Sequence, residues 1–314
     1  MKIIRNFPLK KFTTMAIGGP AKFFVVAKTE RDLEQALVFA RKSRLPWSVV
    51  GEGSNLIVSD RGFRGVIIQN KIEKLDLSRL RHPPQAWGGK GRGRNVTVGA
   101  GNNLLNFILQ LNRAGLSGLE RMAGVPGTVG GAIYGCAGAY GQEIKDHLVS
   151  VRFWDGRKFR NLSRRQCQFS YRSSVFKKHK NWIIVSATFR LELGNSKELL
   201  KISRDTIKLR KKKYWPGLKC PGSFFKNILA SEIKVPTELK NSIIYGKLPA
   251  GVLLERIGAK GMHQGRIRVA EHHANLIYNP GGGMASDVKK LAGKLQTLVK
   301  KKFGIIIDEE VQYI

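Results

Sequence analysis

The chain has 314 residues, 42% of them apolar, which is enough for two or three lobes sharing a sizeable core and excludes a disordered chain. Its 56 Lys and Arg residues against 22 Asp and Glu give a formal net charge of +34. A positive field of this size favours anionic partners. It does not distinguish nucleic acid from small polyanionic nucleotides, or either of these from a basic chain without such a partner.

Cysteine usage and the lack of long apolar runs indicate the compartment. Three cysteines, Cys136, Cys167 and Cys220, cannot form a fully paired disulfide framework, and no two of them have metal-ligand spacing. No apolar run approaches membrane-spanning length, and none of signal-peptide length follows the charged N-terminal residues. We therefore expect a cytoplasmic protein without a membrane partner.

The first seventy residues have the pattern of βαβ-like units in an α/β lobe. Thr29 to Asp32 has the composition of a helix start, and apolar residues then recur on one helical face through Arg41. The pattern therefore predicts a helix over this segment and strands over residues 22–27, 47–50 and 65–69.

The rest of the chain mixes strands and helices in a different order. Asp155-Gly156 follows an apolar strand and predicts a hairpin turn, whereas residues 81–94, rich in Gly, Pro and Arg, predict a loop. The remaining patterns predict strands over 96–100 and 182–193, helices over 104–114, 197–213 and 285–303, and a terminal strand over 304–313.

The first motif that could bind a ligand runs from Val49 to Leu56. An apolar strand enters a turn containing Gly51, Gly53, Ser54 and Asn55, whose successive backbone N–H groups can point at a pyrophosphate. The turn lacks the third glycine of a dinucleotide fingerprint. An ordinary strand-to-loop turn explains the motif equally well.

The second motif extends from Gly124 to Gly141 and contains many glycines. Such a segment has little side-chain bulk with which to build a core, so it is suited to a flat ligand lying against the main chain. A purely structural loop is the alternative. Two Gly-rich loops without a phosphate-loop lysine favour a dinucleotide cofactor over phosphoryl transfer.

These motifs together resemble the FAD-binding signature of bacterial UDP-N-acetylenolpyruvoylglucosamine reductases, which belong to the vanillyl-alcohol-oxidase type of flavoproteins. The resemblance lies in Ile17 to Ala21, Gly51 to Leu56, Gly124 to Gly131 and Ala137 to Gly141, in the family's order and spacing. It implies FAD as the cofactor. The cofactor-binding residues that it implies are Gly51, Gly53, Ser54, Asn55, Leu56, Gly124, Val125, Pro126, Gly127, Thr128, Gly130, Gly131, Ala137, Gly138 and Tyr140.

Three further segments resemble the family's catalytic segments. Residues 171–177 include Arg172 at the place of the family's active-site arginine, and residues 222–227 include Ser223 at the place of its proton-donating serine. The acidic segment 308–312 resembles the family's closing motif, which implies that Glu310 is the catalytic glutamate. No metal is implied, because adjacent His272 and His273 point to opposite faces of a strand.

The resemblance also implies the fold class and its division into domains. The expected architecture is α+β with three lobes, two of which form an FAD-binding unit of the vanillyl-alcohol-oxidase type. The expected boundaries are residues 1–70 for FAD-binding lobe 1, completed by the C-terminal strand 304–314, residues 71–198 for FAD-binding lobe 2, and residues 199–303 for a C-terminal α+β substrate lobe.

The implied activity is NADPH-dependent, FAD-mediated reduction of UDP-N-acetylglucosamine enolpyruvate to UDP-N-acetylmuramate, in peptidoglycan precursor synthesis. Reduction of an enol ether conjugated to a carboxylate needs a hydride at one carbon and a proton at the next. Flavin can supply the hydride, Arg172 can neutralise the carboxylate or the developing enolate, Ser223 can donate the proton and Glu310 can orient this centre. NADPH and an anionic UDP-sugar are the expected partners, and nucleic acid is not.

The sequence departs from the family pattern at a few positions. Cys136 stands where Asn is usual, Ile228 where Pro is usual and Gln312 where Arg is usual. The short interval between Arg172 and Ser223 indicates the family type that lacks an extra tyrosine-bearing substrate loop. The basic loop 81–94 is longer than the family needs, and it has no assigned purpose.

Two other functions are weighed against this one. A different flavoenzyme of the same superfamily would keep the Gly-rich loops but need neither Ser223 nor Glu310, so full activity of a Ser223→Ala variant would favour it. A basic nucleic-acid-binding protein that has lost its enzyme function would be colourless after purification and would not take up FAD.

Overall fold

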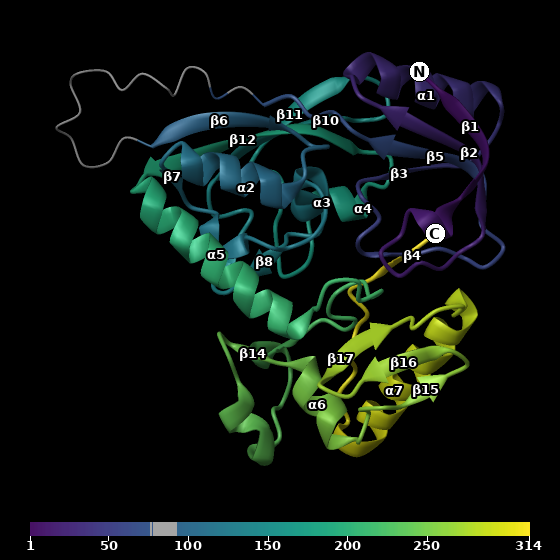
Figure 1. The fold of residues 1–314 in the computed structure, drawn as a ribbon, viewed down its shortest axis with the longest axis vertical. Helices are drawn as coiled ribbons and strands as arrows, with labels where there is room; N and C mark the ends of the chain where they lie inside the picture. Colours follow the sequence, from purple (N-terminus) through teal and green to yellow (C-terminus); the bar gives the residue numbers. More distant parts are fainter. Residues whose placement is uncertain (76, 78–92) are drawn as a thin grey trace. The chain divides into compact units, whose positions relative to one another are not determined.

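The computed structural model describes residues 1–75, 77 and 93–314 (Figure 1). The predicted loop 81–94 therefore lies outside the described residues, except for Gly93 and Arg94. The chain divides into two units that each collect several chain segments. Unit 1 comprises Met1–Ile3, Phe24–Glu52 and Val66–Lys211, and unit 2 comprises Ile4–Phe23, Gly53–Gly65 and Lys212–Ile314.

Helices and strands alternate irregularly along the described chain. The α-helices are α1 (Glu30–Lys42), α2 (Leu104–Arg113), α3 (Val129–Tyr134), α4 (Val175–Lys178), α5 (Ser196–Lys213), α6 (Ala250–Arg256) and α7 (Ala285–Phe303). Short 3₁₀ helices are Leu9–Lys11, Glu120–Met122, Ala230–Glu232 and Thr237–Ser242. In this described part, no helix has both the length and the apolar character that a membrane crossing requires.

The first strands form a four-stranded sheet in the order β1-β2-β5-β3. Its members are β1 (Ile3–Pro8), β2 (Pro20–Ala27), β3 (Trp47–Val50) and β5 (Phe63–Asn70), and β3 runs parallel to β5. Helix α1 follows β2 along the chain and begins with a capping box, in which Thr29 Oγ1 accepts the Asp32 N–H at 3.0 Å and the Asp32 carboxylate accepts the Thr29 N–H at 3.1 Å. The predicted helix start and the predicted strand 47–50 are confirmed.

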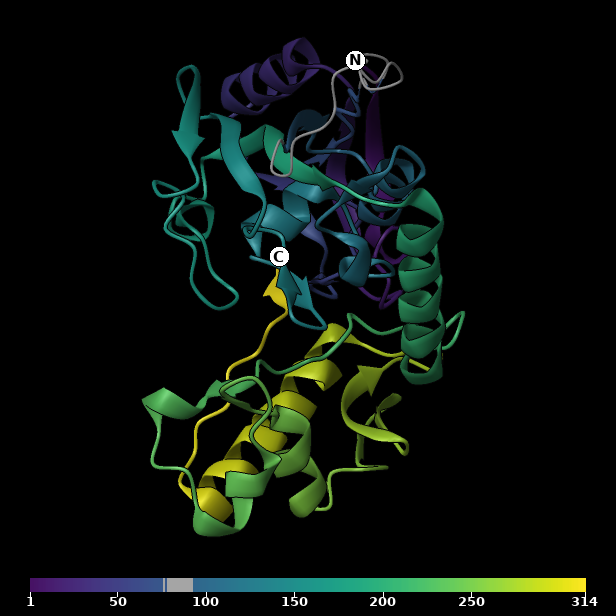
Figure 2. The ribbon, with the colours of Figure 1, turned by 90° about the vertical axis from the view of Figure 1, so that its left-hand side faces the viewer.

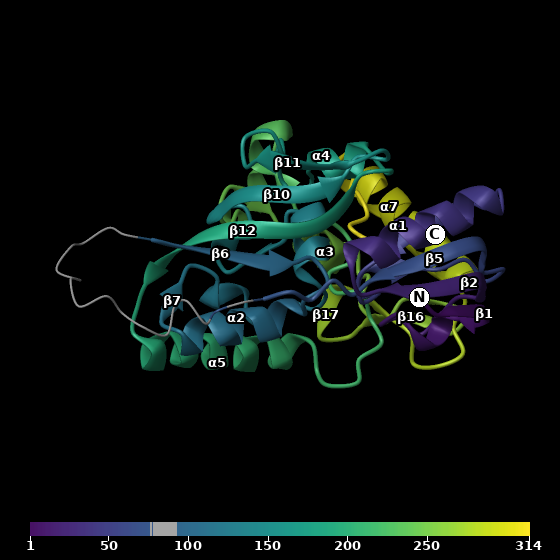
Figure 3. The ribbon, with the colours of Figure 1, turned by 90° about the horizontal axis from the view of Figure 1, so that it is seen from above.

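Unit 1 contains an antiparallel sheet in the order β11-β10-β12-β6, with the short β7 paired to β12. Figure 3 shows β10, β12 and β6 side by side. The strands are β6 (Arg94–Gly99), β7 (Leu116–Ser117), β10 (Leu148–Trp154), β11 (Phe159–Ser163) and β12 (Ile183–Leu193). Helix α2 packs on this sheet, where Phe107 meets Phe189 with ring centroids 5.8 Å apart. The predicted Asp155-Gly156 turn is confirmed, because β10 pairs with β11 across it.

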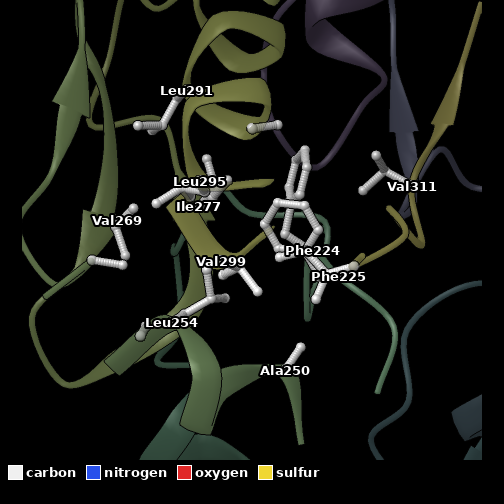
Figure 4. Packing of buried hydrophobic residues seen from close by; sticks show 14 of the residues in the cluster. Phe224, Phe225, Ala250, Leu254, Val269, Ile277, Leu291, Leu295, Val299 and Val311 are labelled. Atoms are coloured by element: carbon white, nitrogen blue, oxygen red, sulfur yellow. The ribbon is translucent and has the colours of Figure 1, made fainter. Parts of the chain in front are cut away.

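Unit 2 is built around a three-stranded antiparallel sheet and two helices. The sheet has the order β15-β16-β17, formed by β15 (His263–Gln264), β16 (Ile267–Ala270) and β17 (His273–Tyr278). Helix α7, the long yellow helix in Figure 2, occupies the range predicted from the sequence, residues 285–303. Its apolar face and that of α6 bury a core that also takes in Phe224 and Phe225 (Figure 4).

The remaining strands are two-residue pairs. Strand β8 (Gly138–Ala139) pairs with β9 (Gln142–Glu143), and β13 (Ile228–Leu229) pairs with β14 (Lys247–Leu248). In unit 2, β18 (Gln312–Tyr313) pairs in parallel with β4 (Leu56–Ile57).

The predicted terminal strand over residues 304–313 is wrong in extent, because only Gln312–Tyr313 is a strand. Gly304 ends α7 in the left-handed conformation at φ 68°, a conformation that glycine adopts without steric cost. Beyond it, Ile305 and Ile307 are buried while Ile306 is exposed. This alternation resembles that of a strand, but the segment crosses the core of unit 2 with a single bridge, from Glu309 to Phe225, in place of a ladder.

Candidate active site

The loop from Gly51 to Leu56 presents unpaired backbone donors. The backbone N–H groups of Glu52, Gly53 and Ser54 donate no hydrogen bond to any residue that the structure describes. Gly53 is buried and has a φ of 71°, and a Cβ there would lie 2.9 Å from the Phe12 carbonyl oxygen. Successive unpaired N–H groups in such a turn form a concave site for an anion. The local geometry fits a phosphate group.

Gly51, at the start of the first Gly-rich loop, lies against Thr128 of the second loop within unit 1. A Cβ at Gly51 would lie 2.5 Å from Thr128 Oγ1, so the first loop can approach the second only because residue 51 is glycine. Next to this contact, Asn103 Nδ2 donates to the Glu52 carboxylate at 2.9 Å, and Asn103 forms a backbone bridge with Thr128. Neither Asn103 nor Glu52 is among the residues predicted to bind the cofactor: Asn103 lies outside the Gly-rich motifs, and Glu52 lies within the first motif between the predicted residues Gly51 and Gly53.

The second loop uses its glycines for two different purposes. Gly124 and Gly127 adopt positive φ angles of 87° and 104°, a conformation that disfavours residues with a Cβ. Gly130 instead allows close packing, because a Cβ there would lie 2.8 Å from the Cβ of Ala100. Gly131 is exposed, and its N–H is capped by Thr128 Oγ1 at 3.1 Å. Main chain is therefore open to a ligand at Gly131, whereas Gly130 serves the packing of the protein itself.

Tyr140 lies at the tip of a tight turn. Ala139 pairs with Gln142, which leaves Tyr140 and Gly141 as the two central residues, with φ angles of 50° and 83°. Two consecutive positive φ angles define the hairpin turn that normally takes Asn-Gly. The turn leaves the Tyr140 side chain 37% exposed, so an aromatic ring is presented at the surface of unit 1 close to Gly138.

Arg172 also lies at the tip of a two-residue turn. Ser170 and Ser173 exchange backbone hydrogen bonds of 3.0 and 3.1 Å, which leaves Tyr171 and Arg172 at the tip. Arg172 has a φ of 54°, a conformation that a turn of this kind normally assigns to glycine or asparagine. Its guanidinium donates to the Gly138 carbonyl oxygen at 3.3 Å. Strained non-glycine residues of this kind cluster at functional sites.

Cys136 is a further non-glycine residue with a positive φ, at 44°. Asparagine tolerates this conformation better than cysteine does, which agrees with the asparagine that the family resemblance leads one to expect at this position. The side chain is 1% exposed. Burial, followed by the charge of Glu143, raises the pKa of the Cys136 thiol to about 11. A neutral, buried thiol packs against its neighbours and is a poor nucleophile.

The segments that carry Ser223 and Glu310 lie side by side within unit 2. The backbone N–H of Glu310 donates to the carbonyl of Phe224 at 2.8 Å, so the closing acidic segment runs beside the residue that follows Ser223. Asn275 fixes the same segment, because its side chain accepts the Phe225 N–H at 2.8 Å and donates to the Phe225 carbonyl at 2.9 Å. Since Phe224 and Phe225 are buried in the core, the backbone that carries Ser223 is held on both sides.

Lys213, the last residue of α5, and Tyr214, which follows it, flank the Ser223 hydroxyl. The Tyr214 hydroxyl lies 3.1 Å from Ser223 Oγ, and Lys213 Nζ lies 3.5 Å from the same atom. Nothing in the spacing of the sequence singled out either residue, because they precede Ser223 by a loop whose path no local pattern determines.

Asn55 ties the first Gly-rich loop to the C-terminal segment. Its side-chain amide donates to the Glu310 carbonyl at 3.0 Å, and the Gln312 N–H donates to the Asn55 carbonyl at 3.0 Å. Leu56 then pairs with Gln312 in the parallel pair β4–β18. The Gln312 side chain, at a position where arginine is usual in the family, donates to the Val311 carbonyl at 3.1 Å.

The neighbouring histidines have separate structural roles. His272 is exposed and donates from Nε2 to the Lys213 carbonyl at 2.9 Å, whereas His273 Nδ1 accepts the Asn275 N–H at 3.1 Å. Burial, followed by the charge of Lys213, lowers the pKa of His273 to about 4. Within residues 1–75, 77 and 93–314, no three His, Cys, Asp or Glu side chains are grouped so that they could hold a metal ion.

Comparisons with known proteins agree with the resemblance seen in the sequence. A family model described as an FAD binding domain matches residues 21–157, and one described as the C-terminal domain of UDP-N-acetylenolpyruvoylglucosamine reductase matches residues 215–314. A UDP-N-acetylenolpyruvoylglucosamine reductase of Solibacter usitatus is 43% identical over 317 residues, which cover 100% of this chain and 97% of the relative. The chain belongs to the UDP-N-acetylenolpyruvoylglucosamine reductase family.

Other members of the reductase family support the same assignment. The relative from Carboxydothermus hydrogenoformans is 37% identical over 318 residues, covering 99% of this chain and 94% of the relative. The crystal structure of the reductase from Thermus caldophilus matches with a TM-score of 0.72 and 27% identity, covering 99% of this chain and 98% of that one. The expected α+β fold with FAD-binding lobes is thus confirmed. The residue roles and lobe boundaries stay predictions.

Proposed function

We propose that this chain reduces UDP-N-acetylglucosamine enolpyruvate to UDP-N-acetylmuramate, with bound FAD and with NADPH as the reductant, in peptidoglycan precursor synthesis. Membership of the reductase family over the whole chain supports the reaction class. The geometric observation that carries the proposal is the hydrogen bond from the Glu310 N–H to the Phe224 carbonyl, 2.8 Å, which sets the acidic segment beside Ser223.

The two Gly-rich loops fit FAD. Unpaired N–H groups at Glu52, Gly53 and Ser54 suit the pyrophosphate, and the exposed main chain at Gly131 suits a flat ring. We assign cofactor binding to these loops with the residues that the sequence motifs imply, among them Thr128, Ala137, Gly138 and Tyr140. When bound, FAD supplies the hydride that NADPH has provided.

Arg172 is proposed to bind the substrate carboxylate and to neutralise the enolate charge that develops after hydride addition. A guanidinium is always charged near neutral pH and matches a carboxylate with two parallel donors. The turn fixes the backbone, and Lys177 Nζ donates to the Arg172 carbonyl at 2.8 Å. The backbone that carries the Arg172 guanidinium is therefore already fixed and does not have to reorganise during the reaction.

Ser223 is proposed to donate its proton to the substrate carbon next to the hydride acceptor, and Glu310 is proposed to orient that centre. Both residues lie on backbone that is hydrogen-bonded to a neighbouring segment of unit 2. A fixed donor of this kind contributes through positioning as well as through acidity.

The proposed function is tested by visible absorption in an anaerobic cuvette. The purified protein should show a flavin spectrum that NADPH bleaches and that the enolpyruvyl nucleotide sugar then restores. Ser223→Ala should leave bleaching by NADPH unchanged and slow the restoration by about 10²-fold or more, since it removes the proton donor. A flavin that NADPH bleaches but the sugar does not restore would overturn the assignment, as would a protein that cannot take up FAD.

A further inference from the structure

Ser223 needs help to act as an acid. An aliphatic hydroxyl is a poor proton donor in water, so it requires a neighbour that stabilises its alkoxide or replaces its proton. The structure places two such groups within 3.5 Å of Ser223 Oγ, the Tyr214 hydroxyl at 3.1 Å and Lys213 Nζ at 3.5 Å. A phenol is a far stronger acid than an aliphatic alcohol, with an ordinary pKa of about 10.

The end of α5 that carries these residues is anchored within unit 2. The Lys213 carbonyl accepts a hydrogen bond from His272 Nε2 at 2.9 Å, and the ring centroids of Trp215 and His272 are 4.8 Å apart. These contacts hold residues 213–215 against the segment that leads into β17. Asn275, three residues after His272 and within β17, fixes Phe225, so the segments on both sides of the Tyr214–Ser223 hydrogen bond contact residues 272–275.

We propose that Tyr214 is the proton relay of Ser223 and that the Lys213 ammonium group stabilises the transient Ser223 alkoxide, an inference that rests on the proposed reductase function. The Tyr214 hydroxyl has the distance of a direct hydrogen bond. Lys213 lies slightly further away and acts through its charge. The influence of this charge extends beyond Ser223, because it also contributes to the low pKa of His273.

The proposed transfer balances in protons and electrons. After hydride addition, the electron pair of the substrate enolate forms a C–H bond with the Ser223 proton, and the Ser223 O–H bond breaks. The Ser223 oxygen then takes the proton of Tyr214. The phenolate of Tyr214, a half-buried residue, then takes a proton from a water molecule, which leaves hydroxide. The enzyme returns to its starting protonation state.

The first test separates the two half-reactions by stopped-flow absorbance. Tyr214→Phe keeps the ring and removes the hydroxyl, so we expect reoxidation of the reduced flavin by the enolpyruvyl sugar to slow at least about tenfold. Flavin reduction by NADPH and binding of the sugar to the oxidised enzyme should stay within about twofold of wild type, because neither step uses the relay. Tyr245→Phe is the matched control, since Tyr245 is 80% exposed.

The outcomes of this test distinguish the relay from the proposed function. If the wild-type reduced flavin is not reoxidised by the sugar, the reductase assignment fails. If the wild type is reoxidised and Tyr214→Phe matches it, the relay is overturned. Parallel losses in flavin reduction, sugar binding and reoxidation would show a structural role for Tyr214 and would also overturn the relay.

The second test measures the charge of Lys213 without any turnover. In a Ser223→Cys variant, the thiol pKa is followed by ultraviolet absorbance of the thiolate, with Ser223→Ala as the blank for the buried native cysteines. Lys213→Met in the Ser223→Cys background should raise this pKa by about one unit, because a nearby cation favours the thiolate. Lys212→Met is the control, since Lys212 is exposed on the same helix.

Several titratable groups on the segments next to residue 223 can contribute to the thiol pKa, so the two lysine variants are compared in the same Ser223→Cys background. Tyr214 and Lys213 come from the end of α5, His272 and His273 from the start of β17, and Glu310 from the C-terminal segment. An equal thiol pKa in the Lys213→Met and Lys212→Met variants would overturn the role of Lys213.

Discussion

Cys136, Tyr140 and Arg172 share a left-handed backbone conformation, which costs about 1–2 kcal/mol for each residue that carries a Cβ. Tyr140 and Arg172 adopt it because each is a central residue of a two-residue turn closed by backbone pairing. Such turns place their side chains with little freedom. Eight non-glycine residues of the described chain have a positive φ, and they include the two side chains predicted to meet the flavin and the substrate, Tyr140 and Arg172.

The low pKa of His273 predicts a pH dependence of stability. Its folded pKa of about 4 lies below the ordinary histidine value of about 6.5. Between these values the unfolded chain binds more protons than the folded chain, so this histidine lowers stability as the pH falls through the window. His273→Asn should therefore lose less Tm than wild type between pH 7 and pH 5, measured by thermal unfolding at each pH.

The control for this measurement is His263→Asn, which changes an exposed histidine of the same unit. It should follow the wild-type pH dependence. If His273→Asn also followed the wild-type curve, the buried imidazole would not be a source of the acid sensitivity.

The N-terminus of α7 depends on a residue far away in the chain. The Asp60 carboxylate accepts the N–H groups of Ala285 and Ser286 at 2.7 and 3.0 Å, while Met284 at the helix start supplies no capping side chain. A carboxylate there satisfies two orphan donors and complements the helix dipole. Asp60→Ala should lower the free energy of unfolding by about 1–2 kcal/mol, measured by urea denaturation.

A charge-matched variant separates the cap from general electrostatics. Asp205→Ala removes a carboxylate from the exposed face of α5, so it raises the net charge equally and should change stability by no more than about 0.5 kcal/mol. Equal destabilisation by the two variants would mean that net charge, and not the cap, stabilises this helix.

Elements with strong local signals were predictable from the sequence. Helix α7 and strand β3 occupy their predicted residues. The helix is marked by a long apolar periodicity and the strand by a short apolar run between residues that break regular structure, and both patterns can be recognised within the segment itself. The segment over residues 304–313 was not predictable, because its alternation reflects the core it crosses and not a partner strand. An alternation of buried and exposed residues does not show whether a segment pairs with another strand, because pairing depends on the tertiary structure.

Site residues could be predicted from the sequence where they belong to a recognisable motif. The glycine motifs include Gly51 and Thr128. That these two residues lie against each other is seen only in the folded chain, where a Cβ at Gly51 would lie 2.5 Å from Thr128 Oγ1. Tyr214 and Lys213 could not be selected, because a hydrogen bond to Ser223 depends on how the loop after α5 returns. The contact between Asn103 and Glu52 could not be predicted either, because it joins two segments that are 51 positions apart in the sequence.

At the scale of the whole molecule, the net charge of +34 predicts salt-sensitive substrate capture. NADPH and the proposed UDP-sugar are both polyanions, and screening weakens their attraction to a cationic protein. Raising KCl from about 50 to about 300 mM should therefore raise both KM values several-fold and change kcat little. Steady-state kinetics check this, and salt-independent KM values would show that the charge does not serve the substrates.

The parallel pair of β4 and β18 gives the chain an order of assembly. Asn55 and Glu310, which are hydrogen-bonded, are 255 positions apart in the sequence, and the Ser59 N–H donates to the Ile314 carbonyl at 2.8 Å. During translation, the N-terminal partners emerge from the ribosome long before the others. The loop predicted to receive the pyrophosphate is thus made early, but its contacts with residues 310–314 can form only after that distant segment has been synthesised.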